Sequence, residues 1–188
     1  MPRPAVHKAE DWVAAGWRAL AEGGPAAVRI EALARSLGVT KGGFYGHFAD
    51  RAALLDAMLA GWRERAGSGL IARVEARGGD PRDKLWALIE TVIREGARSP
   101  EPALRTWARG SEAVRAALAA VDRRRLDYLD AQFQAMGFGG LDATSRARLC
   151  YLALIAEHQL ATAPSLAERL AAARAQFALL TAGLASPG

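Results

Sequence analysis

The segment from residue 33 to residue 48 constrains the fold most, because it reads as two short helices joined by a tight turn. Apolar residues lie at helical spacing on one face of the first helix, at Ile30, Leu33, Ala34 and Leu37. Gly38 follows, and glycine can end a helix in the left-handed conformation at little cost. The pattern predicts a helix-turn-helix, a layout typical of one class of DNA readers.

The second helix of this pair begins at Thr40, whose hydroxyl we expect to cap the first backbone amides. Lys41 places a cation in the first turn, where it opposes the helix dipole by about 0.3 kcal/mol or more. We therefore expect a group outside the helix to favour Lys41, and a phosphate would do so. Phe44, Tyr45 and Phe48 give this helix an aromatic inner side.

Three glycines, Gly42, Gly43 and Gly46, also fall on or beside this second helix. Each glycine costs a helix about 1 kcal/mol relative to alanine. A helix whose backbone closely approaches another molecule needs such residues, whereas an ordinary surface helix does not. An ordinary helical hairpin remains the alternative, with Lys41 as a solvated charge and the aromatic residues as core.

From Trp12 to Leu55 the sequence resembles the N-terminal domain of the TetR family of bacterial transcriptional regulators. The resemblance is carried by Trp12, Gly23-Gly24, Leu33-Ala34, Gly38-Val39-Thr40-Lys41-Gly42, Phe44-Tyr45, His47-Phe48, Arg51 and Leu54-Leu55. It implies an all-helical homodimer that binds a palindromic operator. It also implies a separate C-terminal domain that binds a small effector and helps to form the dimer.

The resemblance further implies which residues contact double-stranded DNA. They are Arg29, Thr40, Lys41, Gly42, Gly43, Tyr45, His47 and Arg51. The family usually has Ser or Thr at the place of Arg29 and at the place of Gly43, and often a larger polar residue at the place of Gly46. We therefore expect phosphate and shape contacts to carry more of the binding than base contacts. Tyr45 and His47 are the side chains expected in a groove, with a capped or partly buried His47 as the alternative.

The charge of the chain permits a polyanionic partner without pointing to one. The formal net charge is +5, but residues 1–51 contribute only +2 of it. The run Arg123-Arg124-Arg125 is typical of a solvated helix face, with an acidic ligand or a second DNA contact as the alternative.

The single cysteine, Cys150, excludes an intrachain disulfide and favours a buried thiol in a reducing compartment. No segment has 18 uninterrupted apolar residues, and the N-terminus lacks a signal-peptide pattern. We therefore expect a cytoplasmic protein without a membrane partner.

Beyond residue 50 the apolar pattern is helical throughout, so the predicted fold class is all-α. A long helix is expected from Asp50 to the glycines at 78–79, weakened at 67–69. Further helices are expected to start at Asp80-Pro81, near Pro100 and at Ser111. We place a three-helix DNA-binding domain at residues 1–50 and a helical effector-binding and dimerisation domain at residues 51–188.

The last two helices, near 142–161 and 165–185, are expected to form the homodimer. Both are rich in alanine, and Ser165 and Glu168 have the spacing of a capping box. In the family such a pair packs against its symmetry mate as a four-helix bundle. The expected seam on the second helix consists of Leu166, Leu170, Ala173, Phe177, Leu180 and Leu184. The alternative is that this stripe packs on its own domain.

An effector cavity among the C-terminal helices is implied by the resemblance. The candidate lining residues are Trp62, Trp86, Trp107, Tyr128, Phe133 and Glu157. Their aromatic character favours an apolar or amphipathic small molecule, although each aromatic residue alone is more often part of a core.

The predicted function is therefore a DNA-binding transcriptional regulator, and family habit favours a repressor released by a small molecule. An enzyme is one rival, but there are only three histidines, no His-Glu-x-x-His motif and no phosphate-binding glycine loop. We expect no catalytic residues, no metal ligands and no cofactor. The other alternative function is a helical protein-interaction module with weak or lost DNA binding. Gly43 and Gly46 support this alternative, because they lack the polar side chains that family members often have there.

Overall fold

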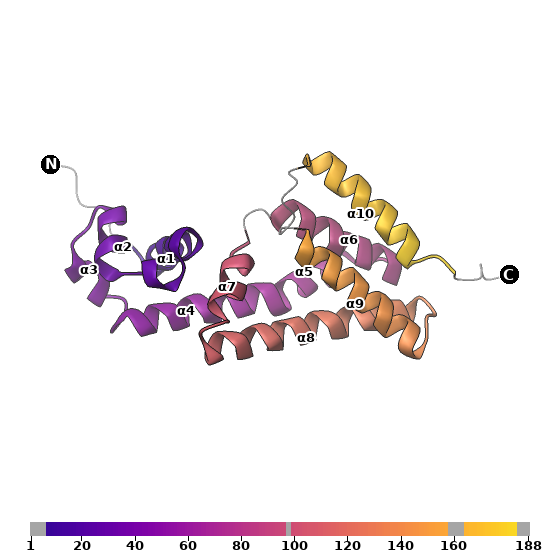
Figure 1. Ribbon diagram of the computed structural model, residues 1–188, viewed down its shortest axis with the longest axis horizontal. Helices are drawn as coiled ribbons and strands as arrows, with labels where there is room; N and C mark the ends of the chain where they lie inside the picture. The colour runs from indigo at the N-terminus through magenta and orange to yellow at the C-terminus, as the bar shows by residue number, and fades with distance from the viewer. Residues whose placement is uncertain (1–6, 97–98, 158–163, 184–188) are drawn as a thin grey trace. The chain divides into compact units, whose positions relative to one another are not determined.

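The computed structural model describes residues 7–96, 99–157 and 164–183, and within these ranges the regular elements are all helical (Figure 1). The elements are α1 (Ala9–Gly23), η1 (Pro25–Ala27), α2 (Ile30–Leu37), α3 (Lys41–Tyr45), α4 (Arg51–Arg63), η2 (Glu64–Gly69), α5 (Leu70–Arg77), α6 (Pro81–Glu95), α7 (Glu101–Trp107), α8 (Glu112–Ala135), α9 (Gly140–Ala156) and α10 (Leu166–Leu180). The all-α prediction is confirmed. No helix in the described ranges is long and apolar enough to cross a membrane.

The chain packs as two compact units, each of which takes two stretches of sequence. The described residues of Met1–Glu64 and Pro100–Leu118 form the first unit, and those of Arg65–Ser99 and Ala119–Gly188 form the second. Helices α4 and α7 thus pack with the three N-terminal helices. The functional boundary placed after residue 50 stays a prediction.

The core of the first unit is built around Trp12 and Phe44, neither of which has exposed surface. Their rings meet edge to face with centroids 5.2 Å apart. The other buried members are Ala15, Leu20, Val28, Leu33, Ala34, Leu54 and Met58. Ala103 and Trp107 of α7 pack against this cluster, so α7 covers part of it.

Local signals set most of the helix ends in the way the sequence predicts. Gly38 ends α2 with φ of 69°. The Asp50 carboxylate accepts a hydrogen bond from the Ala53 amide (2.8 Å), and Asp80 accepts one from Asp83 at the start of α6. Thr40 is the exception, because its side chain makes no capping hydrogen bond to α3. The expected hydroxyl cap at Thr40 is therefore wrong.

The helix that follows Asp50 changes its winding where the sequence predicts a weak point. Residues Glu64–Gly69 form a π-helical segment between α4 and α5, and two glycines, Gly67 and Gly69, lie within it. A π segment leaves backbone groups without their usual i→i−4 partners. In the second unit the Arg125 guanidinium compensates, because its Nε donates to the Ala66 carbonyl (3.1 Å).

Arg125 also joins this segment to α9. Its Nη1 donates to the Tyr151 hydroxyl (3.2 Å), which in turn donates to Asp122 Oδ1 (2.7 Å). Burial raises the pKa of Tyr151 to about 12, so this hydroxyl keeps its proton at neutral pH. Arg125 is therefore half-buried and structural, whereas its neighbours Arg123 and Arg124 are exposed as a solvated face predicts.

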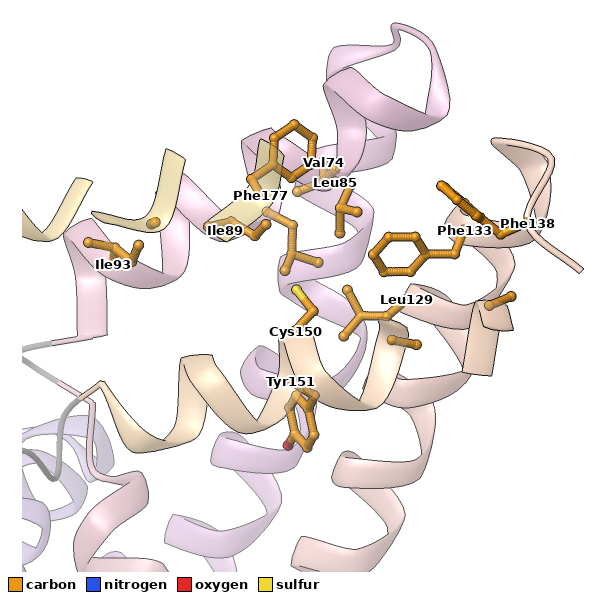
Figure 2. Packing of buried hydrophobic residues seen from close by; sticks show 14 residues of the cluster. Val74, Leu85, Ile89, Ile93, Leu129, Phe133, Phe138, Cys150, Tyr151 and Phe177 are labelled. Atoms are coloured by element: carbon orange, nitrogen blue, oxygen red, sulfur yellow. The ribbon is translucent and has the colours of Figure 1, made fainter. Parts of the chain in front are cut away.

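The core of the second unit lies between α5, α6, α8, α9 and α10 (Figure 2). Its largest fully buried side chains include Phe133, Leu85, Ile93 and Leu129. Figure 2 shows Cys150 pointing into this cluster beside Leu129, which confirms the expected buried thiol.

Helix α10 lies alongside α6 in this unit (Figure 1). Phe177 is 4% exposed, and its ring centroid lies 5.6 Å from that of Trp86 on α6. Ala173 is also buried, and Leu170 and Leu180 pack against the same core. These four residues of the stripe expected in a dimer seam thus pack on their own unit, whereas Leu166 is 43% exposed. One apolar stripe cannot specify which surface covers it. Leu184 lies outside the described residues.

Helix α9 begins at Gly140 and ends at Ala156, with Glu157 as its C-cap. The helix expected near 142–161 is thus present, and residues 158–161 of that expectation lie outside the described residues. At the start of α10 the capping box is confirmed: Ser165 Oγ accepts from the Glu168 amide (3.3 Å), and Glu168 Oε2 accepts from the Ser165 amide (2.7 Å).

Candidate DNA-binding site

Helices α2 and α3 form the predicted helix-turn-helix. After Gly38 the Val39 amide still donates to the Ala34 carbonyl (3.0 Å), which closes the end of α2 before the chain turns into α3. Phe44 then fixes α3 to the core, since it contacts Trp12 on one side and Phe48, with ring centroids 5.5 Å apart, on another. Burial of Phe44 determines which face of this short helix points outward.

The residues on that outward face are those predicted to contact DNA. Thr40, Lys41, Gly42, Gly43 and His47 are all exposed, and Tyr45 exposes 52% of its surface. The partly buried His47 considered as an alternative is therefore wrong. Arg29, which precedes α2, is also exposed and makes no capping hydrogen bond.

Lys41 has an intramolecular partner that the sequence did not reveal. Its Nζ lies 2.6 Å from Glu31 Oε1 on α2. The hydrogen bond from Lys41 lowers the pKa of Glu31, and the same bond raises the pKa of Lys41. The group that offsets the unfavourable helix position of Lys41 in this structure is thus a carboxylate of the same chain.

Arg51 is the predicted DNA residue most engaged within the protein. Its Nε donates to the Val28 carbonyl (2.6 Å), and its Nη2 donates to the Pro25 carbonyl. The half-buried guanidinium therefore holds the η1 turn in place before α2. Its DNA contact stays a prediction, and its structural role was missed because the two carbonyls lie 23 and 26 residues away in sequence.

The three glycines near α3 are not required by packing within the protein. A Cβ built on Gly42 or Gly46 would approach no other atom closer than 3.7 Å, and one on Gly43 would lie 4.0 Å from Trp12. None of the three has a positive φ among the described residues. Each still lowers helix stability. Their presence fits an outer surface that another molecule approaches closely.

The residues predicted to line an effector cavity are distributed over both units, and their role stays a prediction. Trp62 and Trp107 belong to the first unit, whereas Trp86, Tyr128, Phe133 and Glu157 belong to the second. Phe133 is fully buried in the core. The Tyr128 hydroxyl donates to Glu75 (2.7 Å), and burial, followed by this bond, raises the Tyr128 pKa above its usual range.

A small hollow of about 20 Å³ lies between α6, α9 and α10 of the second unit. It is lined by Ile89, Ile93, Cys150, Ala153, Leu154, Glu157, Ala173, Gln176, Phe177 and Leu180. Glu157 is the one member of the predicted set among them, and its carboxylate accepts a hydrogen bond from Arg169 Nε (2.8 Å). Sequence patterns could not separate these lining residues from ordinary core positions.

The comparison with protein families agrees with the position of this site. Residues 13–58 match the family model for bacterial regulatory proteins of the tetR family, a range that contains α2, α3 and most of α4. No curated protein matches the sequence at a significant level.

Solved structures share the fold over nearly the whole chain. A putative TetR-family transcriptional regulator from Rhodococcus sp. is 24% identical, with a TM-score of 0.71, over 93% of this chain and 98% of that one. The fatty acid degradation regulator FadR from Bacillus halodurans is 16% identical, with a TM-score of 0.68, over 98% of both chains. AibR, solved with isovaleryl coenzyme A and operator DNA, is 18% identical, with a TM-score of 0.70, over 93% of this chain and 98% of that one.

At these identities the solved structures establish the fold, while the family model identifies the segment that carries the helix-turn-helix. With the exposed face of α3 and the buried Phe44 behind it, these findings agree with the resemblance seen in the sequence. Residues 13–58 thus match the tetR family of bacterial regulatory proteins, and the chain shares its fold with solved TetR-family regulators.

Proposed function

We propose that this protein is a ligand-responsive transcriptional regulator that binds a palindromic operator as a homodimer. The observation that carries the proposal is the outer face of α3, which presents Lys41, Tyr45 and His47 together with unobstructed glycine backbone. Such a face can place a cation near phosphates and two polar aromatic side chains in a groove. It lies within the segment that matches the family model.

The proposed contacts divide into two kinds. Arg29, Thr40, Lys41 and the backbone at Gly42 and Gly43 would bind the phosphate backbone, which gives affinity and strong salt dependence. Tyr45 and His47 would reach base edges. Arg51 would reach a phosphate with the guanidinium donors that do not bond to the Pro25 and Val28 carbonyls. With few long side chains on this face, shape-dependent contacts should contribute much of the sequence preference.

The dimer would form through the outward faces of α9 and α10. Large apolar side chains remain exposed there in the single chain: Leu141 (82%), Leu149 (59%), Leu152 (49%), Leu166 (43%) and Leu179 (75%). Exposed apolar surface of this kind marks interaction sites in soluble proteins. A two-fold arrangement would bury both copies of the surface and set the spacing of the two recognition helices.

The effector would be an apolar or amphipathic small molecule bound in the second unit, and its binding would release the operator. Two proteins of similar fold are associated with acyl compounds: AibR was solved with isovaleryl coenzyme A, and FadR is described as a fatty acid degradation regulator. The apolar hollow beside Glu157 and the aromatic set Trp86, Tyr128 and Phe133 are the candidate regions. We expect the protein to act in the cytoplasm, without catalytic activity.

The test is an unbiased selection of DNA. Purified full-length protein is mixed with random duplexes and with fragments of its own genome, and the bound DNA is sequenced. An enriched two-fold symmetric sequence, especially in the protein's own promoter, supports the proposal. Absence of any enriched sequence, with a folded dimeric protein, would favour the protein-interaction module instead.

A further inference from the structure

The pair formed by Glu31 and Lys41 links the two helices of the DNA reader on their exposed side. Glu31 is the second residue of α2, and Lys41 is the first residue of α3. Their side chains expose 60% and 50% of their surfaces, so both charges face solvent. The carboxylate therefore lies on the surface where the proposed function places a DNA phosphate.

Helix dipoles favour this pairing in the free protein. A carboxylate near the start of α2 is stabilised by the helix dipole, whereas an ammonium at the start of α3 is destabilised by it. Glu31 therefore offsets an unfavourable position of Lys41. Arg35 lies four residues after Glu31, at the spacing of a helical ion pair, yet the hydrogen bond of Glu31 goes to Lys41 across the turn.

The Tyr45 hydroxyl adds to the local charge balance, since it acts on Lys41 in the direction that raises the Lys41 pKa. Lys41 lowers the pKa of Glu31 most, and Arg29 lowers it to a lesser extent. The Glu31 carboxylate is thus influenced by the cations of both Lys41 and Arg29. A phosphate that approaches Lys41 must displace the Glu31 carboxylate or lie beside it.

We propose that Glu31 limits the operator affinity of this regulator by competing with a DNA phosphate for the ammonium of Lys41. The proposal rests on the DNA binding proposed above. In the free protein Lys41 bonds to Glu31, and in the complex it bonds to a phosphate while Glu31 remains near the backbone as an unpaired or repelled charge. Exposed ion pairs are weak, so a DNA phosphate can replace Glu31 as the partner of Lys41. Breaking the Glu31–Lys41 pair nevertheless lowers the affinity of each protomer for DNA.

The test compares Glu31→Gln with the unchanged protein on a duplex selected by the unchanged protein. Glu31→Gln removes the charge and should tighten binding about two- to fivefold for each recognition domain, which is the range expected from an exposed pair. The log-log salt slope should steepen by up to about 0.9 per domain, because the variant no longer leaves a carboxylate that holds a cation beside the DNA. Glu22→Gln is the matched control, because Glu22 is an exposed acid of the same unit at the end of α1.

A double-mutant cycle with Lys41→Ala identifies the route of the effect. If Glu31 acts through Lys41, Glu31→Gln should gain little in the Lys41→Ala background. An equal gain in both backgrounds would overturn the proposal and assign the effect to direct repulsion of DNA. Weaker binding of Glu31→Gln would also overturn it, and would point to a base contact by the carboxylate, such as one to a cytosine amino group.

The result distinguishes this inference from the proposed function. If the unchanged protein selects no duplex, the proposed DNA binding fails. If a duplex is selected and Glu31→Gln binds it with the affinity and salt slope of the unchanged protein, only the competition by Glu31 fails. Thermal unfolding of each variant checks that the fold is retained.

Discussion

Among single residues, Phe44 and Tyr45 show how adjacent aromatic side chains on α3 take different roles. Phe44 has no exposed surface and meets Trp12, whereas Tyr45 is half exposed and meets Phe44 edge to face at 5.4 Å. The sequence placed both rings on one inner side. Adjacent residues of a helix point about 100° apart, so the orientation that buries Phe44 turns Tyr45 outward.

This contrast predicts opposite effects of two substitutions. Phe44→Ala should destabilise the first unit by about 3–5 kcal/mol, because it leaves a cavity in the core. Tyr45→Phe should leave stability unchanged and weaken DNA binding about two- to tenfold, through loss of one hydroxyl hydrogen bond. Urea unfolding and a DNA-binding titration measure the two quantities. Unchanged DNA affinity of Tyr45→Phe would remove the hydroxyl from the proposed interface.

Cys150 gives a prediction about reactivity. Burial raises the pKa of its thiol to about 12, and only the thiolate is a strong nucleophile. The folded protein should therefore react with iodoacetamide at pH 8 far more slowly than the urea-unfolded protein, as mass spectrometry can follow. Rapid alkylation of the folded protein would show that α9 opens locally.

The same shift has a consequence for stability. A folded-state pKa above the unfolded value means that the unfolded chain loses the Cys150 proton first as pH rises. This contribution to stability is thus present below the usual thiol pKa and declines from about pH 9 up to the folded pKa. A Cys150→Ala variant, compared across pH 8–10, should lack that part of the decline.

At the scale of helices, the π segment Glu64–Gly69 interrupts the α-helical winding between α4 and α5. Its two glycines weaken α-helical winding, and Arg125 bonds the Ala66 carbonyl from α8. The same guanidinium reaches Tyr151, so one side chain connects the segment to α9. The segment should therefore depend on Arg125 more than on the exposed arginines beside it.

Arg125→Gln should destabilise the protein by about 1.5–3 kcal/mol, the range for hydrogen bonds that involve a charged group. Amide hydrogen exchange in a peptide covering residues 64–70 should also become faster. Arg123→Gln is the control, since Arg123 is exposed on the same helix. Equal effects of the two substitutions would show that Arg125 does not support the π segment.

At the scale of the whole molecule, the apolar surface of α9 and α10 separates into an inner and an outer part. Phe177 and Ala173 are buried within the second unit, while Leu149, Leu152 and Leu179 are exposed. The proposed dimer therefore uses Leu179, which lies outside the predicted stripe of α10, and Leu166 alone of the described residues in that stripe. This distinction changes the substitutions that test the interface.

Leu179→Glu or Leu149→Glu should convert the dimer to a monomer in sedimentation experiments without loss of helical circular dichroism, because a charge would enter the apolar interface. Phe177→Ala should instead lower stability by about 3–5 kcal/mol through a core cavity. A dimer that persists in both glutamate variants would move the interface away from α9 and α10. The monomeric variants should bind a palindromic duplex much more weakly, since two linked sites act together.

The sequence alone determined the helices and most of their ends. Gly38, Asp50, Asp80 with Pro81, and Ser165 with Glu168 act on backbone groups within about four residues, so their effect can be read without knowing the fold. The family resemblance likewise located the reader, since its residues fall in one continuous stretch. The predicted functional residues of α3 could be identified for the same reason, because they are consecutive or nearly consecutive in the sequence.

Only the tertiary structure decided which groups meet across helices. Lys41 pairs with Glu31, and Arg51 bonds to backbone carbonyls that precede α2. The Thr40 side chain makes no capping hydrogen bond, and Phe177 is buried in the core of the second unit. The tertiary structure also divided the six candidate cavity residues between two units. Each of these outcomes depends on how helices far apart in sequence pack, and an amphipathic stripe or a single charge fixes the face of a helix but not the partner that covers it.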